Sequence, residues 1–223
     1  MSRLLIVFSL TIAACVAQAE TLPAVLSRMD AGAAKFQAMQ ANLKMTTHTA
    51  ILDDDTVESG DIKMQKTSTE TRALLDFNGE KDQRTIAFGD KSIQVYYPNV
   101  KLVQIYNVGR QSNVLDQFLL LGFGTSGKDL AKSYDIKLLG GEAINGQDTS
   151  HLELTPKSSA VLEIIAKAEV WLPLNSPYPV QQKFYFPSGD YRLVTYTGFQ
   201  LNPAFPQGLL KLQIPSGVKV TRQ

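Results

Sequence analysis

Residues 122–129 read Gly-Phe-Gly-Thr-Ser-Gly-Lys-Asp and contain two phosphate-binding spacings, G-x-G-x-x-G and G-x-x-x-x-G-K. A phosphate loop requires a buried strand before it, a helix after it, and a serine or threonine after the lysine to hold magnesium. Here an apolar, helix-like segment precedes the glycines, and Asp129 replaces the hydroxyl residue. A carboxylate at that position would repel phosphate. We therefore interpret the segment as a flexible loop that ends a helix.

The histidines and acidic residues form no recognisable metal motif. His48 and His151 each lie in a strand-like pattern beside a hydroxyl residue, whereas a zinc site needs three or four ligands. The acidic residues 53–55 and Glu58 lack the spaced oxygen ligands and the glycine of a calcium loop. We interpret them as a solvated hairpin turn, and we expect no metal and no cofactor.

The sequence also offers no catalytic nucleophile with a supporting motif. Ser126 lies in Gly-Thr-Ser-Gly-Lys, which departs from the G-x-S-x-G turn of many hydrolases. A serine near His151 stays open as an alternative, because catalytic triads are assembled in space and not along the sequence. We predict a binding protein without catalytic residues and keep a hydrolase as the alternative.

The composition is that of a folded, electrically balanced protein. Of 223 residues, 44% are hydrophobic and 19% are charged, which is typical of globular chains. The 22 basic and 21 acidic residues nearly cancel, and no basic stripe accompanies the aromatic residues. Nucleic acid is therefore not an expected partner.

The N-terminus has the pattern of an export signal. A short basic start is followed by an apolar stretch from Leu4 to Ala14, and residues 17–19 read Ala-Gln-Ala before Glu20. This arrangement predicts a signal peptide over 1–19, cleaved before Glu20. We expect a periplasmic protein whose residues 20–223 form a single domain.

The only cysteine leaves a second possibility for the N-terminus. Residues 12–15 read Ile-Ala-Ala-Cys, which resembles a lipobox, so lipidation of Cys15 would instead make an outer-membrane lipoprotein. In both cases the fold has no disulfide to stabilise it and depends on burial of its core.

Hydrophobic periodicity predicts mostly strands. Apolar residues at three- and four-residue intervals predict a first helix from Leu22 to Gln40. Period-two alternation separated by turn residues then indicates an antiparallel meander, which resumes after a helical interruption. The predicted strands are 43–51, 57–66, 69–77, 84–88, 91–97, 101–108, 134–139, 149–155, 161–172, 180–186, 191–201 and 209–214.

The most apolar run after the leader interrupts these strands. Apolar residues at 114, 115, 118, 119 and 121 predict a helix from Val114 to Leu121 that must be buried. Glycines follow it, and a short helix through Ala131 comes next. We predict a mainly β (α+β) fold: a strongly curved antiparallel half-barrel of about eleven strands, with helices covering its concave apolar face. A plain sandwich core is the alternative.

The order of these elements resembles the LolA-like outer-membrane lipoprotein carrier family, also called the lipoprotein-sorting family. The resemblance extends over nearly all of the chain after the leader. Besides the first helix running into a strand, the segments that carry it are the Gly-Asp strand 60–66, the hairpin of Asp90-Lys91 and Val95-Tyr-Tyr-Pro98, the strand 152–157 (Leu-Glu-Leu-Thr-Pro-Lys) and the closing 215–220 (Pro-Ser-Gly-Val-Lys-Val).

The resemblance implies a non-catalytic, monomeric carrier with a helical lid over an apolar cavity. Its cargo would be the acyl chains of lipoproteins, or another lipid. It would receive them from an inner-membrane lipoprotein-releasing transporter and pass them to an outer-membrane acceptor. A sensor module anchored by Cys15, which binds a lipid or a partner protein in the same cavity, is the alternative.

The same resemblance gives candidate site residues. Gly122, Gly124 and Gly127 are expected to form the hinge of the lid. Lys66 occupies the position where the family has an arginine that ties lid to sheet, and it is the candidate latch. The residues expected to contact lipid are Leu43, Met45, Ile62, Met64, Phe77, Ile86, Phe88, Ile93, Val95, Val103, Ile105, Leu115, Phe118, Leu119, Phe184 and Phe186.

Overall fold

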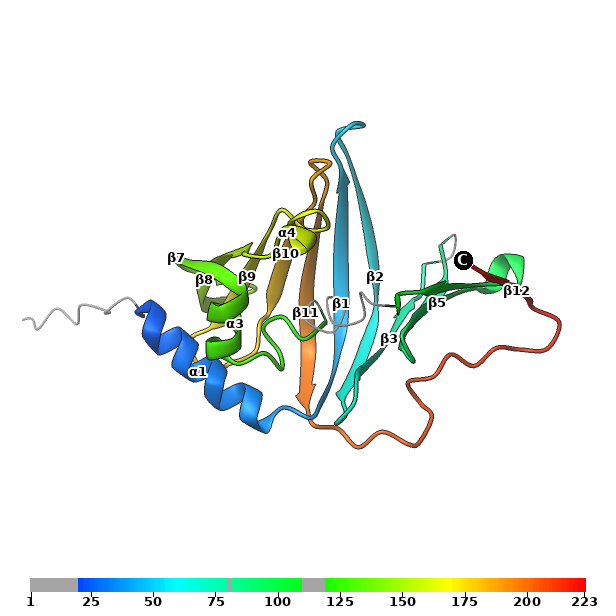
Figure 1. Ribbon diagram of the computed structural model, residues 1–223, viewed down its shortest axis with the longest axis horizontal. Helices are drawn as coiled ribbons and strands as arrows, with labels where there is room; N and C mark the ends of the chain where they lie inside the picture. The colour runs from blue at the N-terminus through cyan, green and yellow to red at the C-terminus, as the bar shows by residue number, and fades with distance from the viewer. Residues whose placement is uncertain (1–19, 80–81, 110–118) are drawn as a thin grey trace, which may run out of the picture.

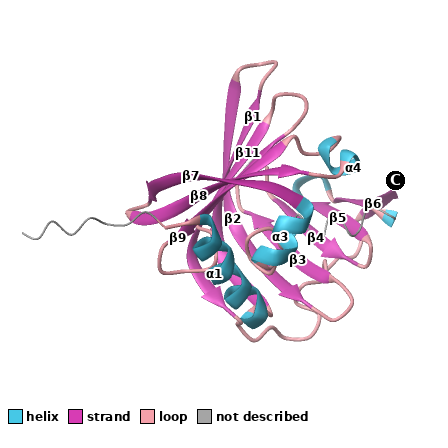
Figure 2. Cartoon of the chain, turned by 60° about the vertical axis from the view of Figure 1, so that its left-hand side comes forward, coloured by secondary structure: helices cyan, strands magenta, loops and turns pink. Residues whose placement is uncertain are grey.

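Twelve strands form one curved, open sheet, with helices packed in its concavity (Figures 1 and 2). The computed structural model describes residues 20–79, 82–109 and 119–223. The predicted signal peptide with Cys15, the start of the predicted lid helix, and the candidate lipid contacts Leu115 and Phe118 lie outside the described residues. The fold class predicted from the sequence is confirmed.

The elements follow one another along the chain with short connections over most of its length. The helices are α1 (Leu22–Lys35), η1 (Pro98–Val100), α3 (Gly127–Ser133) and α4 (Ser159–Leu162). The strands are β1 (Ala38–Thr49), β2 (Asp54–Lys66), β3 (Thr71–Phe77), β4 (Arg84–Gly89), β5 (Ser92–Tyr97), β6 (Leu102–Asn107), β7 (Tyr134–Ile144), β8 (Gln147–Pro156), β9 (Lys167–Pro173), β10 (Gln181–Tyr185), β11 (Tyr191–Leu201) and β12 (Lys219–Arg222).

The sheet consists of two meanders joined along one seam. Its strand order is β12-β6-β5-β4-β3-β2-β1-β11-β10-β9-β8-β7. Each neighbour in β1–β6 and in β7–β11 is also a neighbour in sequence, and the β1–β11 pair joins the two halves. Among the described strands, the β12–β6 pair alone is parallel. Among the described residues, no helix is long and apolar enough to cross a membrane.

Helix α1 ends five residues before the predicted boundary. Pro23 fits its first turn, and the chain becomes extended at Phe36 before β1 begins at Ala38. Met39 is fully buried. The apolar residues after Lys35 satisfy a strand's two-residue alternation as well as a helix's spacing, which explains why the helix was predicted too long.

Helices α1 and α3 fill the concave face of one half of the sheet. Val25 and Met29 of α1 and Leu130 of α3 are buried against apolar side chains of β8, β9 and β10. The two helices approach closely at Gly127, where a β-carbon would lie 2.3 Å from the Leu26 carbonyl oxygen. This half therefore has a core of buried apolar side chains between the helices and the sheet.

Two predicted strands are wrong. Residues predicted as a strand from Val161 begin in the short helix α4, and β9 starts only at Lys167, because an apolar run alone does not distinguish helix from strand. Residues 209–214 form no strand. They belong to an irregular segment, 203–218, which we call the C-terminal strap, and the closing segment instead supplies β12.

The C-terminal strap covers the convex face of the β3–β4 region. Leu210 is buried there together with Leu74 and Ala87, and Phe205 and Leu212 pack around them. In Figure 1 the strap runs in orange and red from the end of β11 past β3 to the far edge of the sheet. The C-terminal strap thus covers apolar residues on the convex face of this region.

Candidate functional site

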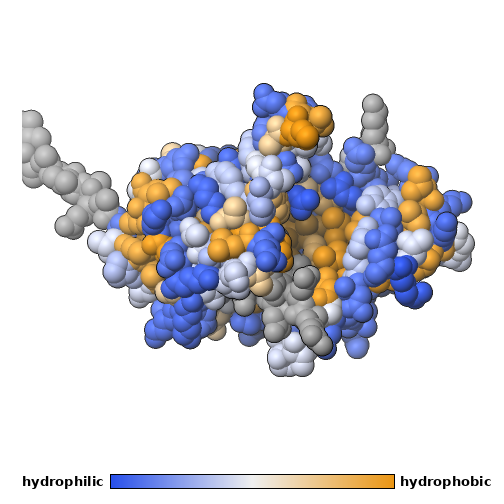
Figure 3. Space-filling model, turned by 45° about the horizontal axis from the view of Figure 1, so that its top comes forward, coloured by the Kyte–Doolittle hydropathy of each residue, from blue (hydrophilic) through white to orange (hydrophobic). Residues whose placement is uncertain are grey.

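A cavity of about 560 Å³, open on one side, lies on the concave face of the sheet, lined by side chains of β1–β4, β10 and β11. This volume lies within the roughly 300–1,000 Å³ of known small-molecule pockets. Figure 3 shows a hydrophobic hollow between the two halves of the sheet, below the projecting β1–β2 hairpin. Its lining residues are Leu43, Met45, Thr47, Thr56, Glu58, Ile62, Leu75, Phe77, Asp82, Arg84, Ile86, Phe88, Leu119, Phe123, Gln182, Phe184, Arg192, Val194 and Tyr196.

Strand register brings these side chains together. Leu43 of β1 lies opposite Tyr196 of β11, and Met45 lies opposite Val194. On the other side, Leu75 of β3 is paired with Ile62 of β2 and Ile86 of β4. Since residues directly opposite each other project from the same face, the alternating apolar residues of five strands form one continuous surface.

Residues 119–123 form one wall of the cavity. Phe123 is buried, meets the ring of Tyr196 edge-on at a centroid distance of 5.2 Å, and stacks on Phe199 at 6.0 Å. Phe36, at the end of α1, lies 6.5 Å from Phe123. The segment after the predicted lid helix is therefore packed against the sheet by aromatic contacts.

Two buried hydrogen bonds hold this segment in place. The Tyr196 hydroxyl donates to Gln182 Oε1 at 2.6 Å, and Gln182 Nε2 donates to the Leu121 carbonyl. Burial of Tyr196 raises the pKa of its phenol, so the hydroxyl keeps its proton at any pH near neutrality. We call this chain of groups the Tyr196–Gln182–Leu121 relay; it connects β11 and β10 to the wall of the cavity.

A charged pair lies on the β2–β4 side of the cavity. Arg84 makes a two-pronged ion pair with Glu58, and its guanidinium lies 4.2 Å above the ring of Phe77. The hydrogen bond to Glu58, acting against burial, raises the pKa of Arg84. The charges of this pair cancel, and the aromatic ring shields one face of the guanidinium.

Half of the residues predicted to contact lipid line the cavity. Met64 is buried in the adjoining core, and Ile93 and Val95 share the concave face without lining the cavity. Phe186 packs on the solid core of the other half. Lipid contact itself stays a prediction. The candidates that line the cavity are Leu43, Met45, Ile62, Phe77, Ile86, Phe88, Leu119 and Phe184.

The predicted lipid contacts Val103 and Ile105 are corrected by the register. Val95 is paired with Gln104, so Gln104 shares the concave face, and its two neighbours project from the convex one. Val103 is nevertheless fully buried. A strand with apolar residues on a covered convex face cannot be oriented from its alternation alone.

The candidate hinge glycines are closely packed. Gly122 has a φ of 79°, which favours glycine. A β-carbon at Gly124 would lie 2.8 Å from Leu120 and 2.9 Å from Phe36. Lys66, the candidate latch, extends its ammonium group to within 3.5 Å of the Gly124 carbonyl oxygen. The hinge function of the glycines and the latch function of Lys66 stay predictions. The contact between Lys66 and Gly124 supports the latch function.

The residues first considered for catalysis have structural partners. The Ser126 side chain caps α3 by accepting a hydrogen bond from the Asp129 backbone N–H, which accounts for the hydroxyl and the carboxylate of the glycine-rich segment. His151 stacks on Trp171 at 4.2 Å. No group of three potential metal ligands occurs among the described residues.

The structure adds polar residues that the sequence did not indicate. Gln182, Arg84, Arg192 and Tyr196 all line the cavity. Each stands in phase with apolar residues of its strand, two positions from Phe184, Ile86 or Val194. The sequence signal for these residues was a polar side chain two positions from an apolar one on the same strand face. That signal does not tell which face of the sheet borders a cavity.

Comparison with known proteins rests on structure, since no protein-family model and no curated protein matches the chain. An uncharacterized conserved protein from Thermus thermophilus has a TM-score of 0.52 at 13% identity, over 89% of this chain and 97% of that one. The two chains share a fold.

Other solved structures match at lower scores. The lipoprotein LppX of Mycobacterium tuberculosis has a TM-score of 0.49 at 18% identity, over 82% of this chain and 98% of that one. A LolA superfamily protein from Nitrosomonas europaea has a TM-score of 0.42 at 15% identity, over 86% and 98%. Scores and identities this low say nothing of this chain's family or cargo.

Proposed function

We propose that this protein is a non-catalytic carrier that binds the acyl chains of lipoproteins, or another lipid, and passes them toward the outer membrane. The observation that carries the proposal is the concave cavity of about 560 Å³, in which apolar side chains of β1–β4, β10 and β11 face a common hollow. Protein interiors are normally close-packed, so a hollow lined by aliphatic and aromatic groups favours an apolar occupant.

Burial of methylene groups would supply the binding energy. Each buried methylene contributes about 0.8 kcal/mol, so eight of them contribute about 6 kcal/mol before the losses of association are subtracted. Such binding is reversible, as a carrier requires. Aromatic contacts and the Tyr196–Gln182–Leu121 relay would close the wall over the chain, and both can separate without disrupting the sheet.

A matched pair of variants on one strand tests this function. Met45 lines the cavity, whereas Thr46 lies next to it on the convex face. Met45→Glu should weaken binding of a fluorescent fatty acid at least tenfold, because it places a charge against the chain. Thr46→Glu should leave binding unchanged. A protein that binds no fluorescent fatty acid and carries no lipid by native mass spectrometry would refute the proposal.

The cellular setting belongs to the same proposal. We infer a monomer in the cell envelope, in the periplasm, that receives cargo from an inner-membrane lipoprotein-releasing transporter and delivers it to an outer-membrane acceptor. The sequence supports this through its export-signal pattern, and the LolA-like fold agrees with it.

The second candidate is a lipid-anchored binding or sensor module that uses the same cavity. It is favoured by the lipobox-like sequence before Cys15. Mass measurement of the mature protein separates the two: a chain that begins at Glu20 has lost the cysteine, whereas a chain that begins with diacylated Cys15 is anchored.

A further inference from the structure

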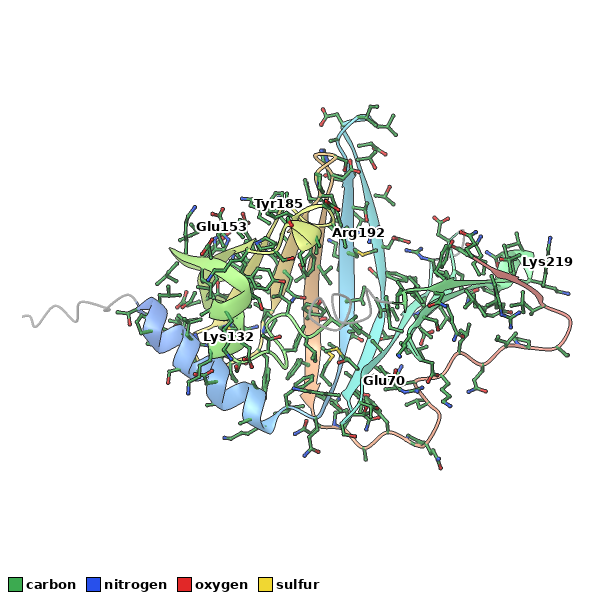
Figure 4. The ribbon with its side chains drawn as sticks, in the orientation of Figure 1. Glu70, Lys132, Glu153, Tyr185, Arg192 and Lys219 are labelled. Atoms are coloured by element: carbon green, nitrogen blue, oxygen red, sulfur yellow. The ribbon has the colours of Figure 1, made fainter. Side chains whose placement is uncertain are left out.

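The cavity changes from apolar to polar in one direction along its strands. On β11 the lining residues run Tyr196, Val194, Arg192, and on β1 they run Leu43, Met45, Thr47. Thr47 lies opposite both Arg192 and Thr56 of β2. These three side chains form a polar row toward the β1–β2 hairpin, which we call the mouth. Figure 4 labels Arg192 on this part of the sheet.

Arg192 is the positively charged residue of the mouth, and no described ion pair joins it to a carboxylate. Among the described ion pairs, Arg84 is matched with Glu58, but Arg192 has none, and its guanidinium lies 5.4 Å from the ring centre of Phe186. The neighbouring Asp190 accepts hydrogen bonds from the Ala50 backbone N–H and the Ser188 hydroxyl, which lower the pKa of its carboxyl. The positive charge of Arg192 acts on this carboxyl in the same direction, but no described ion pair joins the two side chains.

The mouth therefore offers a particular set of donors. A guanidinium presents a planar fork of N–H groups that matches a carboxylate or a phosphate. The hydroxyls of Thr47 and Thr56, next to Arg192 in the row, can donate further hydrogen bonds to the same anion. The apolar surface begins at the next residue pair on the concave face, Val194 and Met45. The polar row and the apolar surface are thus adjacent, as the head and the chain of one amphiphile are.

We propose that the cavity selects amphiphiles with an anionic head, whose carboxylate or phosphate contacts Arg192 while the chain lies against β1–β4. This inference rests on the proposed carrier function and names its ligand class. Arg192 acts as a specificity-determining residue, because an uncharged or cationic head gains nothing from it. The Arg84–Glu58 pair stays structural, since its charges are already neutralised by each other.

A series of dodecyl compounds that differ only in the head tests the proposal. Laurate, dodecyl phosphate, dodecanol and dodecyltrimethylammonium compete with a fluorescent fatty acid for the purified protein. Laurate or dodecyl phosphate should bind roughly fivefold more tightly than dodecanol, as one solvent-accessible ion pair allows. Preference for laurate identifies a fatty acid as the source of the anion, and preference for dodecyl phosphate identifies a phospholipid.

Variants of Arg192 assign the preference to this residue. Arg192→Met should bind all four compounds with nearly equal affinity, and Arg192→Glu should favour dodecyltrimethylammonium. Arg222→Met removes one positive charge from β12, where the residue is exposed and does not line the cavity, and should keep the preference for the anions.

Each outcome decides one of the two proposals. Wild-type protein that binds dodecanol as tightly as laurate and dodecyl phosphate overturns the anionic selection while the carrier function stands. A preference that persists in Arg192→Met overturns the role of this residue. Failure of every compound, and of the fluorescent fatty acid, refutes the carrier function itself.

Discussion

Replacing Gln182 by leucine should destabilise the protein far more than the same change one residue earlier. Gln182 is buried and joins the Tyr196 hydroxyl to the Leu121 carbonyl. Leucine has a similar volume but can do neither, so it leaves two buried polar groups without a partner. Each costs about 1–3 kcal/mol. We expect a loss of about 3 kcal/mol in the free energy of unfolding.

Gln181→Leu is the matched control. Gln181 lies on the same strand but faces the convex side, where its Oε1 accepts one hydrogen bond from Thr195 in a half-buried setting. Its loss should cost about 1 kcal/mol. For a chain of this size each kcal/mol lowers Tm by about 2–4 °C, so thermal unfolding should show a fall of roughly 6–12 °C for Gln182→Leu and about a third of that for Gln181→Leu.

A double-mutant cycle sharpens the test. If the relay acts as a unit, Tyr196→Phe should cost less in the Gln182→Leu background than in the wild type, because its partner is already gone. Two leucine variants with the same Tm, or effects of Tyr196→Phe that add fully to Gln182→Leu, would show that the relay does not hold the wall of the cavity.

Three further changes follow from particular contacts. Gly60→Ala should destabilise by several kcal/mol in chemical denaturation, because a β-carbon there would lie 2.1 Å from the Asp76 backbone oxygen, whereas Gly79→Ala has nothing within 4 Å and should be nearly neutral. Leu210→Asp should release the C-terminal strap and speed its proteolysis, since it places a charge among buried apolar residues; an unchanged cleavage rate would contradict this. The pKa of Glu20 is lowered by hydrogen bonds from Arg28 and Ser150, although burial acts to raise it. Its contribution is therefore present above its ordinary pKa of 4.5 and lost as pH falls through the lower folded value, so Glu20→Gln should flatten this part of the acid unfolding curve.

Strand alternation predicted several residues of the site. Leu43, Met45, Ile62 and Ile86 were assigned to the cavity because polar residues alternate with them, and the register places them there. The same rule failed at Val103, because this buried apolar residue projects from the convex side of β6. Alternation identifies a face, but what covers it depends on distant parts of the chain.

Local pattern also could not predict the ends of elements that meet in space. The first helix was predicted to extend to Gln40, because the buried face of the following strand continues the apolar spacing by chance. Residues 209–214 have the composition of a strand but no neighbouring strand with which to pair. The polar relay and the mouth were equally hidden, because they depend on which strands become neighbours, and no pattern within one strand specifies this.

The seam between β1 and β11 has a consequence for the order in which the protein folds. Within each half of the sheet, hairpins join neighbours in sequence, and such contacts form quickly. The seam pairs Leu43 with Tyr196, so it closes a long loop and pays a larger entropic penalty. Because both residues face the cavity, neither half alone contains the complete binding surface. A folding intermediate with two formed meanders would thus be rich in β-structure yet unable to hold a ligand, and ligand binding would report the final step of folding.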